Sequence, residues 1–274
     1  VTSDRKPNGE DERHWHSANY MTRSEDGTGV ILGAAPIQSK GNKPTQEGFA
    51  RTLVEAGVTH VMCLTDVNDP ISMRQKRKEY FESELDLKAS GVKFKPGDSS
   101  ELAKYRADYG DDGGINQKVT HRDLSVTYGG ETKEVNHYYL EGWPDNKLPG
   151  GSDGREPILN QLIDQFLDET ANETGPVKPM LHCSSGSGRA GVATVVLFCR
   201  AAQRPGHPLN KANLVLDVLR DHFEGKQIDQ LTAVEWDQLI EVVTVKMRQK
   251  RSEIVIQTED QMNFMLGAAG RNNV

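Results

Sequence analysis

The segment LHCSSGSGRAG, residues 181–191, places Cys183 six positions before Arg189, with only serine and glycine between them. An apolar run, VATVVLF, follows directly and predicts a helix behind the segment. A loop that enters a helix gathers backbone N–H groups, and the helix start adds partial positive charge. Such a loop favours a tetrahedral oxyanion. The candidate binding residues are Arg189, with its planar guanidinium, and Ser184, Ser185, Gly186, Ser187 and Gly188.

Cys183 lies in the same positive field as the proposed oxyanion. A helix N-terminus beside a cation favours the thiolate form of a cysteine, and a thiolate is a competent nucleophile at neutral pH. The pattern therefore indicates attack of sulfur on a phosphoryl group. The alternative is a glycine-rich entry to a helix beside an inert, buried cysteine. The preceding His182, the two glycines and the strand–loop–helix setting favour the reactive cysteine.

A thiolate that displaces an alkoxide or phenoxide needs an acid to protonate the leaving oxygen. Asp145 lies in EGWPDNKLPG, residues 141–150, upstream of the cysteine loop. Pro144 stiffens this segment, and Trp143 can pack when the loop closes. Taken alone, Trp-Pro-Asp is also compatible with a solvent-facing turn. Together with the cysteine loop, it predicts a general acid on a closing loop.

A third polar cluster, QTEDQ at 257–261, can hold the water that hydrolyses a phosphorylated cysteine. An amide suits this task because it both donates and accepts hydrogen bonds. Gln257 and Gln261 are four residues apart and share one face of a helix start that Thr258 can cap. By itself the segment is an ordinary capped helix.

The three stretches WPD, HCSSGSGR and QTEDQ resemble, in identity and order, the class I cysteine-based protein tyrosine phosphatases. Weaker similarity covers ANYM at 18–21 and the segment from GAAPIQ through VMCLTD. The resemblance implies an α+β fold with a single central mixed, twisted β-sheet flanked by α-helices. It also implies a phosphotyrosine-containing protein or peptide as substrate, with no metal and no other cofactor.

The resemblance assigns a role to each candidate residue. Cys183 would form a cysteinyl-phosphate, and Asp145 would act first as general acid and then as general base. Gln261 would position the attacking water with help from Gln257, and His182 would help to set the thiolate.

The sequence departs from the family pattern in several places. Ala190 stands where the family has Ser or Thr, whose hydroxyl stabilises the thiolate, so we expect slower breakdown of the phospho-enzyme. The Asn-Arg-Tyr-like motif that selects for phosphotyrosine depth is not found. The basic stretch MRQKRSEIVIQT is offset by one residue. We expect the carboxylate that orients Arg189 between residues 95 and 115, with three candidates: Glu101, Asp111 and Asp112.

The elements that must position these residues follow from periodicity. We predict a helix over 45–57 ending at Gly57, a buried strand over 58–64, and a hairpin turning at Gly129-Gly130. An amphipathic helix over 156–170, capped by Ser152 or Asp153, precedes the strand VKPMLHC. Further helices are predicted at 189–203, 209–223, 231–250 and 257–269.

Composition sets limits on the remaining properties. The chain has 274 residues, 27% of them charged, and a net charge of −7, which argues against nucleic-acid binding as the main activity. No apolar run approaches the length of a membrane span, and three scattered cysteines fit a reducing compartment.

We expect a monomeric, cytoplasmic protein with a polar arm at 1–17 and one catalytic domain at 18–274, carrying a helical insertion around 205–235. Its start at Val1 indicates a processed chain or a fragment, and the loose fit to animal enzymes resembles bacterial effectors secreted into host cytoplasm.

Three alternatives follow from the same motifs. The first is a cysteine phosphatase that acts on inositol phosphates or lipid headgroups, or one with dual specificity. Sites for inositol phosphates and lipid headgroups usually add Lys or His inside the signature loop or after the Trp-Pro-Asp, whereas this loop holds Ser and Gly. Low-molecular-weight phosphatases and arsenate reductases place the cysteine near the N-terminus, an order this chain excludes. A weakly active phosphotyrosine-binding pseudophosphatase is supported only by Ala190.

Overall fold

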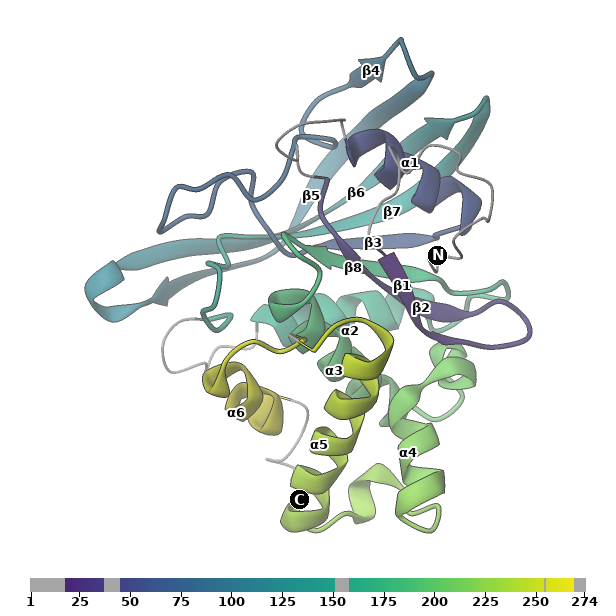
Figure 1. Ribbon diagram of the computed structural model, residues 1–274, viewed down its shortest axis with the longest axis vertical. Coiled ribbons are helices and arrows are strands. Elements are labelled where there is room, and N and C mark those ends of the chain that lie inside the picture. Colours follow the sequence, from purple (N-terminus) through teal and green to yellow (C-terminus); the bar gives the residue numbers. More distant parts are fainter. Residues whose placement is uncertain (1–17, 37–44, 151–157, 254, 269–274) are drawn as a thin grey trace.

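A mixed eight-stranded sheet crosses the molecule in the computed structural model, in the order β1-β2-β8-β3-β7-β6-β5-β4 (Figure 1). The model describes residues 18–36, 45–150, 158–253 and 255–268. The expected arm at 1–17 and the predicted caps Ser152 and Asp153 lie outside the described residues. The strands are β1 (Ala18–Arg23), β2 (Gly29–Ala34), β3 (His60–Cys63), β4 (Leu85–Leu87), β5 (Val92–Asp108), β6 (Gly114–Tyr128), β7 (Glu131–Glu141) and β8 (Pro179–Cys183).

The centre of the sheet is parallel and its margins are antiparallel. β8 pairs in parallel with β2 on one side and β3 on the other, and β3 pairs in parallel with β7. The pairs β1/β2, β7/β6, β6/β5 and β5/β4 are antiparallel. A parallel strand needs a buried environment on both faces, which explains why every residue of β8 and β3 is buried. The predicted α+β fold with one mixed sheet is confirmed.

Helices cover both faces of the sheet (Figure 1). On one face α1 packs Phe49 and Leu53 over β6 and β7. The other face carries the larger core, built from α3 and the helices around it. The helices are α1 (Thr45–Glu55), α2 (Ile158–Thr170), α3 (Gly188–Ala202), α4 (Leu214–His222), α5 (Ala233–Lys250) and α6 (Glu259–Ala268), with short 3-10 turns η2 (Gly110–Asp112), η3 (Pro208–Ala212) and η4 (Ile228–Gln230).

Most predicted elements are confirmed, with one correction. The hairpin turns at Gly129 and Gly130, whose φ angles of 60° and 84° suit a two-residue turn of strands with right-handed twist. The single helix predicted over 209–223 is wrong. Asn213 interrupts it, because its extended backbone ends η3 and its side chain caps α4 by accepting from Val215 N at 3.0 Å. Whether residues 205–235 are an insertion stays a prediction.

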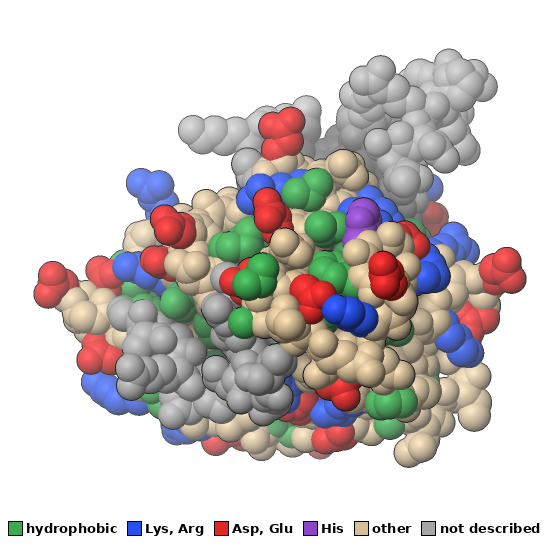
Figure 2. All heavy atoms as spheres, turned by 90° about the horizontal axis from the view of Figure 1, so that it is seen from below, with side chains coloured by type: hydrophobic (Ala, Val, Ile, Leu, Met, Phe, Trp, Pro, Cys, Tyr) green, Lys and Arg blue, Asp and Glu red, His purple; other side chains and the backbone are tan. Residues whose placement is uncertain are grey.

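The surface carries charges of both signs. The face seen from below, where α4 and α5 lie, shows acidic and basic side chains interspersed with apolar ones (Figure 2). Lys246 pairs with Asp221 at 3.7 Å, and Lys226 with Glu235 at 2.5 Å. Within the described residues, no helix has the length and apolarity needed to cross a bilayer.

Candidate active site

The cysteine loop joins the carboxyl end of β8 to the start of α3. Cys183 is the last residue of β8 and is 2% exposed. The loop is held by backbone contacts: Ala35 N donates to Cys183 O at 2.7 Å and to Ser184 O at 3.2 Å. Gly186 has φ +70°, and a Cβ there would meet Gly33 O at 2.3 Å. Glycine is therefore required at this point of the loop, as the sequence suggested.

The loop is arranged to receive an anion. Within the described part of the chain, the backbone N–H groups of Ser184, Ser185, Gly186 and Ser187 donate to no protein acceptor. Ser187 begins α3 without a side-chain cap hydrogen bond, which leaves the first helical donors open to a ligand. Aligned donors at a helix start are a common oxyanion site.

Arg189 connects this loop to the Trp-Pro-Asp segment. Its Nη1 donates to Trp143 O at 2.7 Å, and its Nη2 lies 3.3 Å from Asp145 Oδ1. The side chain is fully buried, and its Nε makes no hydrogen bond to any described residue. A buried, unsatisfied guanidinium donor is costly unless a ligand anion pairs with it.

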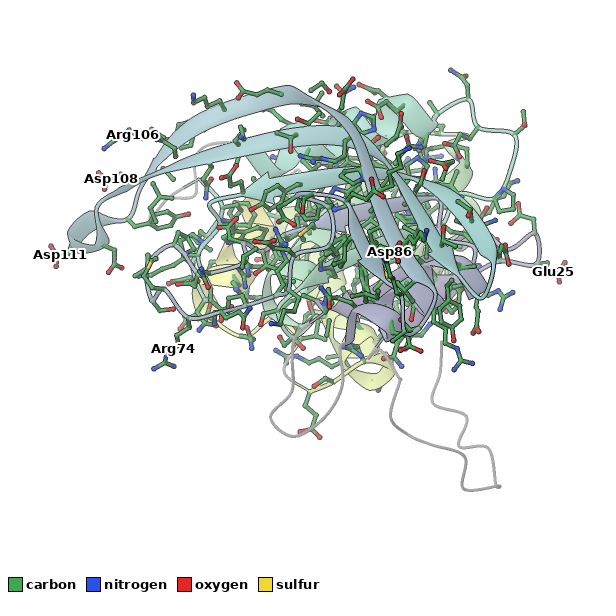
Figure 3. All side chains as sticks on the ribbon, turned by 90° about the horizontal axis from the view of Figure 1, so that it is seen from above. Glu25, Arg74, Asp86, Arg106, Asp108 and Asp111 are labelled. Carbon is green, nitrogen blue, oxygen red and sulfur yellow. The ribbon has the colours of Figure 1, made fainter. Side chains whose placement is uncertain are left out.

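The candidates for the carboxylate that orients Arg189 are wrong. Asp112 pairs with Lys147 at 2.8 Å, whereas Glu101 and Asp111 are exposed. The physical reason is that residues 92–128 form a long hairpin, whose tip carries Asp111 away from the body of the molecule (Figure 3). The carboxylate beside Arg189 is that of Asp145.

Asp145 is held by two residues that sequence analysis missed. Its backbone N donates to Asp69 Oδ2 at 2.7 Å, and its Oδ2 accepts from Lys76 Nζ at 2.5 Å. Burial tends to raise the pKa of Asp69, but N–H groups of Ser72 and Asp145 outweigh it and lower that pKa. An Asp-Pro turn at 69–70 was the available sequence signal.

Trp143 anchors the same segment. It is fully buried, and its Nε1 donates to Lys147 O at 2.8 Å, which closes the turn around Pro144 and Asp145. Asn146 takes φ +59°, a left-handed conformation that Asn tolerates better than most residues. Trp143 is thus packed in this structure, and the closure of the loop that the sequence suggested stays a prediction.

The glutamine cluster lies against the start of α3, as predicted. A Cβ added at Gly188 would meet Gln257 Oε1 at 2.3 Å and Gln261 Nε2 at 3.4 Å. Thr258 Oγ1 accepts from Gln261 N at 3.1 Å, so the predicted cap is confirmed. Gln261 is fully buried, and its Nε2 has no partner among the described residues. Its Oε1 accepts from Gln257 N at 2.8 Å, so the open Nε2 is the part of the amide that can donate to a water beside the cysteine loop.

Ile256 carries strain next to this cluster. Its φ of +62° is unusual for a β-branched residue and indicates that the surroundings impose the conformation. Arg248 donates to Val255 O at 3.0 Å and Ile256 O at 3.2 Å, and Ile256 N lies 3.4 Å from Ser187 O. These contacts hold the strained residue and direct Gln257 toward the loop.

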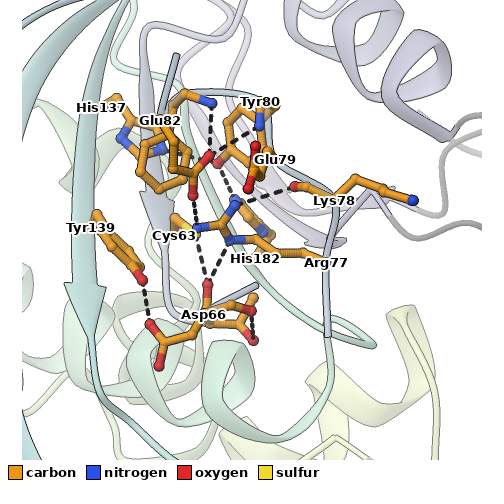
Figure 4. A network of polar contacts seen from close by, with 12 residues as sticks. Cys63, Asp66, Arg77, Lys78, Glu79, Tyr80, Glu82, His137, Tyr139 and His182 are labelled. Carbon is orange, nitrogen blue, oxygen red and sulfur yellow. Dashed lines mark hydrogen bonds and ion pairs between the residues drawn. The ribbon is translucent and has the colours of Figure 1, made fainter. Parts of the chain in front are cut away.

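A buried hydrogen-bond chain supports the cysteine loop from behind (Figure 4). His182 Nε2 lies 2.6 Å from Tyr80 Oη, which lies 2.9 Å from Nε2 of His137. Burial, and then the nearby His182, hold the pKa of His137 well below its usual value, so His137 is neutral. Arg77 stacks over Phe81 at 4.5 Å beside this chain. Sequence analysis gave no role to Tyr80 or His137, and the expected effect of His182 on the Cys183 thiolate stays a prediction.

The three cysteines are free and buried, but their environments differ. Burial raises the pKa of Cys63 to about 11 and raises that of Cys199 as well, so neither ionises near neutrality. Cys183 ends β8 and begins the loop with open backbone donors, and its charge interacts with the Arg251 guanidinium. Within the described ranges, no group of three or more His, Cys, Asp or Glu side chains could hold a metal ion.

The site thus brings together a buried thiol, a loop with open backbone donors and the carboxylate of Asp145 beside Arg189. A family model described as protein-tyrosine phosphatase matches residues 3–269. The chain belongs to the protein-tyrosine phosphatase family.

Similar proteins are found in sequence and in structure. Receptor-type tyrosine-protein phosphatase R of Rattus norvegicus is 40% identical over 81 residues, covering 28% of this chain and 12% of the relative. Tyrosine-protein phosphatase 1 of Dictyostelium discoideum is 25% identical over 128 residues, covering 47% and 20%. The matches therefore span a fifth or less of these relatives' lengths.

The solved catalytic domain of human protein tyrosine phosphatase non-receptor type 18 has the same fold. It superposes with a TM-score of 0.63 at 20% identity, covering 95% of this chain and 75% of the other. A second structure, PTPN18 in complex with HER2-pY1196 phosphopeptides, gives 0.62 at 19% identity, covering 95% and 72%.

Proposed function

We propose that this chain hydrolyses phosphotyrosine in proteins or peptides through a cysteinyl-phosphate on Cys183. The observation that carries the proposal is the position of Arg189, which contacts both Trp143 O and Asp145 Oδ1 from the cysteine loop. These contacts support a site in which the nucleophile, the anion donors and the acid act on one phosphoryl group, as phosphoryl transfer requires.

In the first step Cys183 sulfur forms a bond to phosphorus while the bond to the phenolic oxygen breaks. Asp145, in its protonated form, gives its proton to the departing oxygen. The three remaining phosphoryl oxygens are held by Arg189 and by the backbone N–H groups of Ser184 to Gly188. These donors stabilise the charge that builds up on the equatorial oxygens.

In the second step a water attacks phosphorus and the sulfur–phosphorus bond breaks, which releases phosphate and the Cys183 thiolate. Gln261 orients this water, with Gln257 beside it, and Asp145 takes up the proton that the water loses. His182, bonded to Tyr80, holds the loop in place behind the sulfur. None of these steps calls for a metal or a further cofactor.

The substrate class draws support from a neighbour of the same fold. PTPN18 was solved with HER2 phosphopeptides, and a tyrosine phosphopeptide is what we propose for this chain. The proposed site is complete within one chain, which fits a monomer, and the free cysteines fit the cytoplasm. The relatives come from mammals and Dictyostelium discoideum, so the expected bacterial-effector type has no support among them.

The test is steady-state hydrolysis of a phosphotyrosine peptide, a phosphoserine peptide and inositol hexakisphosphate in the presence of a chelator. Cys183→Ser and Asp145→Ala are measured alongside the wild type. We expect turnover of the tyrosine peptide alone, abolished by Cys183→Ser. Asp145→Ala should slow it by about 10²-fold or more, because general-acid catalysis contributes 10² to 10⁴.

Each of the other outcomes would assign the chain to a different functional class. Turnover of inositol hexakisphosphate or of the serine peptide would assign the chain to an inositol phosphate or dual-specificity phosphatase. Tight phosphotyrosine binding without any turnover would make it a binding module.

A further inference from the structure

Gln117 on β6 is a fully buried amide beside the general-acid loop, residues 142–150. Its Nε2 donates to Gly142 O at 3.1 Å, and its Oε1 accepts from Gly150 N at 2.9 Å. One side chain therefore bonds to both ends of the loop that carries Asp145. The second Nε2 proton goes to Tyr109 Oη at 2.7 Å.

Tyr109 extends this connection along the loop. It lies just before η2 at the tip of the β5–β6 hairpin and is 4% exposed. Its hydroxyl accepts from Gln117 and donates to Leu148 O at 2.8 Å. Gln117 and Tyr109 together thus bond three backbone groups of the loop, at Gly142, Leu148 and Gly150.

The hinge at Gly142 is held from the opposite side as well. Gly142 N donates to Asp66 Oδ2 at 3.0 Å while its carbonyl accepts from Gln117. Gly142 has φ +81°, and a Cβ there would lie 2.4 Å from Asn116 O. The N–H and the carbonyl of Gly142 are therefore both hydrogen-bonded, which restricts the direction in which the loop leaves β7 toward Arg189.

The type of residue at position 117 argues for a specific role. An apolar side chain could fill this buried position without hydrogen bonds, whereas a buried amide is unfavourable unless its hydrogen bonds are made. The hydrogen bonds of the Gln117 side chain go to the acid loop or to Tyr109, which itself bonds the loop. The amide therefore stabilises one conformation of this loop.

We propose that Gln117 and Tyr109 are positioning residues that close the acid loop into a ring and so set where Asp145 meets the leaving oxygen. This inference rests on the proposed phosphatase function. Neither residue contacts the phosphoryl group. Their effect passes through Asp145, so it appears in the steps where Asp145 gives or takes a proton.

The experiment compares Gln117→Leu and Tyr109→Phe with the wild type on two aryl phosphates. 4-Nitrophenyl phosphate has a good leaving group that needs little protonation, whereas phenyl phosphate depends on the acid. We expect Gln117→Leu to lower kcat/KM, which reports the first step, about tenfold for phenyl phosphate and less than about threefold for the nitro compound, because small misplacements of a catalytic group cost up to about 10²-fold. The second step is common to both substrates, so a loss in phospho-enzyme breakdown should be the same for both. Tyr109→Phe should give the same pattern, but weaker.

A double variant tests whether the effect passes through Asp145. Once the acid is absent, its position no longer matters, so Gln117→Leu should slow Asp145→Ala no further. Asn213→Ala is the matched control, because it removes another buried amide, one that bonds Phe198 O at 2.8 Å near α4. That control should lower thermal stability without changing the ratio of the two substrates.

Hydrogen exchange supplies a readout that does not depend on turnover. Gln117→Leu should speed amide exchange in residues 142–150 and leave residues 183–189 unchanged. An equal loss of kcat/KM for both substrates, additive loss in the Asp145→Ala background, or unchanged exchange in the loop would each overturn the proposal. A wild-type protein that hydrolyses neither aryl phosphate would contradict the phosphatase function instead, and the exchange result would still decide the role of Gln117.

Discussion

The cysteine loop and the acid loop meet at Arg189, but the chain builds them in different ways. Residues 182–189 are consecutive, and backbone contacts to neighbouring strands hold them, such as those from Ala35 N. Residues 142–150 are held by side chains far away in sequence, from Asp66, Asp69 and Gln117. The position of Cys183 therefore depends mainly on a local motif, whereas the position of Asp145 depends on residues from distant parts of the chain.

The largest expected effect comes from a backbone change in the cysteine loop. Gly186→Ala places a Cβ 2.3 Å from Gly33 O and 2.7 Å from Ala34 N, and both contacts are backbone atoms that cannot move aside. We expect kcat to fall more than about 100-fold for 4-nitrophenyl and phenyl phosphate alike, because displaced N–H donors of an oxyanion site cost about 10² to 10³.

The control for Gly186→Ala is Gly91→Ala. Gly91 has a similar φ of +67°, but a Cβ there meets nothing within 4 Å. This variant should lose about 1 kcal/mol of stability from the left-handed backbone and keep its activity. Equal activity of Gly186→Ala and Gly91→Ala would mean that the loop does not need its tight fit against β2.

Gly142→Ala applies the same change to the acid loop. Its Cβ would lie 2.4 Å from Asn116 O, so the hinge must shift and Asp145 with it. We expect about a tenfold loss of kcat/KM for phenyl phosphate and a smaller loss for the nitro compound, since kcat/KM reports the first step, in which Asp145 protonates the leaving group. Gly130→Ala, with φ +84° and nothing within 4 Å, is the control. Identical losses for both substrates would remove the distinction between the two loops.

The features that the sequence predicts well are those set by neighbouring residues along the chain. The strand–loop–helix setting of Cys183 and the cap at Thr258 could be predicted because each follows from a short segment, whereas the position of Gln257 beside the loop was implied only by the family resemblance. Periodicity similarly located α1, α2 and the β6–β7 hairpin. In each of these cases one short segment of sequence determines both the side chains and the backbone structure that holds them.

The partners of Asp145 could not be predicted in the same way. Asp69 and Lys76 lie 76 and 69 residues away from it, on a segment without periodicity. The three candidates for the carboxylate that orients Arg189, sought at 95–115, lie on the β5–β6 hairpin. The composition of this segment did not indicate how long the hairpin is. Such contacts depend on the register of β3, β6 and β7, which a single sequence does not reveal.

Asp69→Asn should weaken the acid loop in a pH-dependent manner. Hydrogen bonds from Ser72 N and Asp145 N outweigh burial and lower the pKa of Asp69 below 3.8. The charged form therefore stabilises the fold above about pH 4 and loses this effect as pH falls through the lowered pKa. We expect the variant to lose about 1 to 2 kcal/mol at pH 7 and less at pH 3, measured by urea unfolding. In kinetics it should lower kcat severalfold for phenyl phosphate, and a loss of stability equal at both pH values would contradict the ionic role.

Ala190→Ser should have the smallest effect and should change the cysteine loop alone. Ala190 is buried in the first turn of α3, behind Cys183, where the family carries a hydroxyl. A hydroxyl there can donate to the thiolate, which makes sulfur a better leaving group in the second step. We expect a two- to fivefold rise in phospho-enzyme breakdown, since one such hydrogen bond contributes about 1 kcal/mol. Pre-steady-state bursts measure the breakdown rate, and the pH dependence of Cys183 alkylation measures the effect on the thiol, with Ala201→Ser at the far end of α3 as control.

A double variant tests whether the two loops act independently. Because breakdown also uses Asp145, the gain from Ala190→Ser should persist in the Gly142→Ala background if they do. A gain that disappears there would show that the loops are coupled through Arg189.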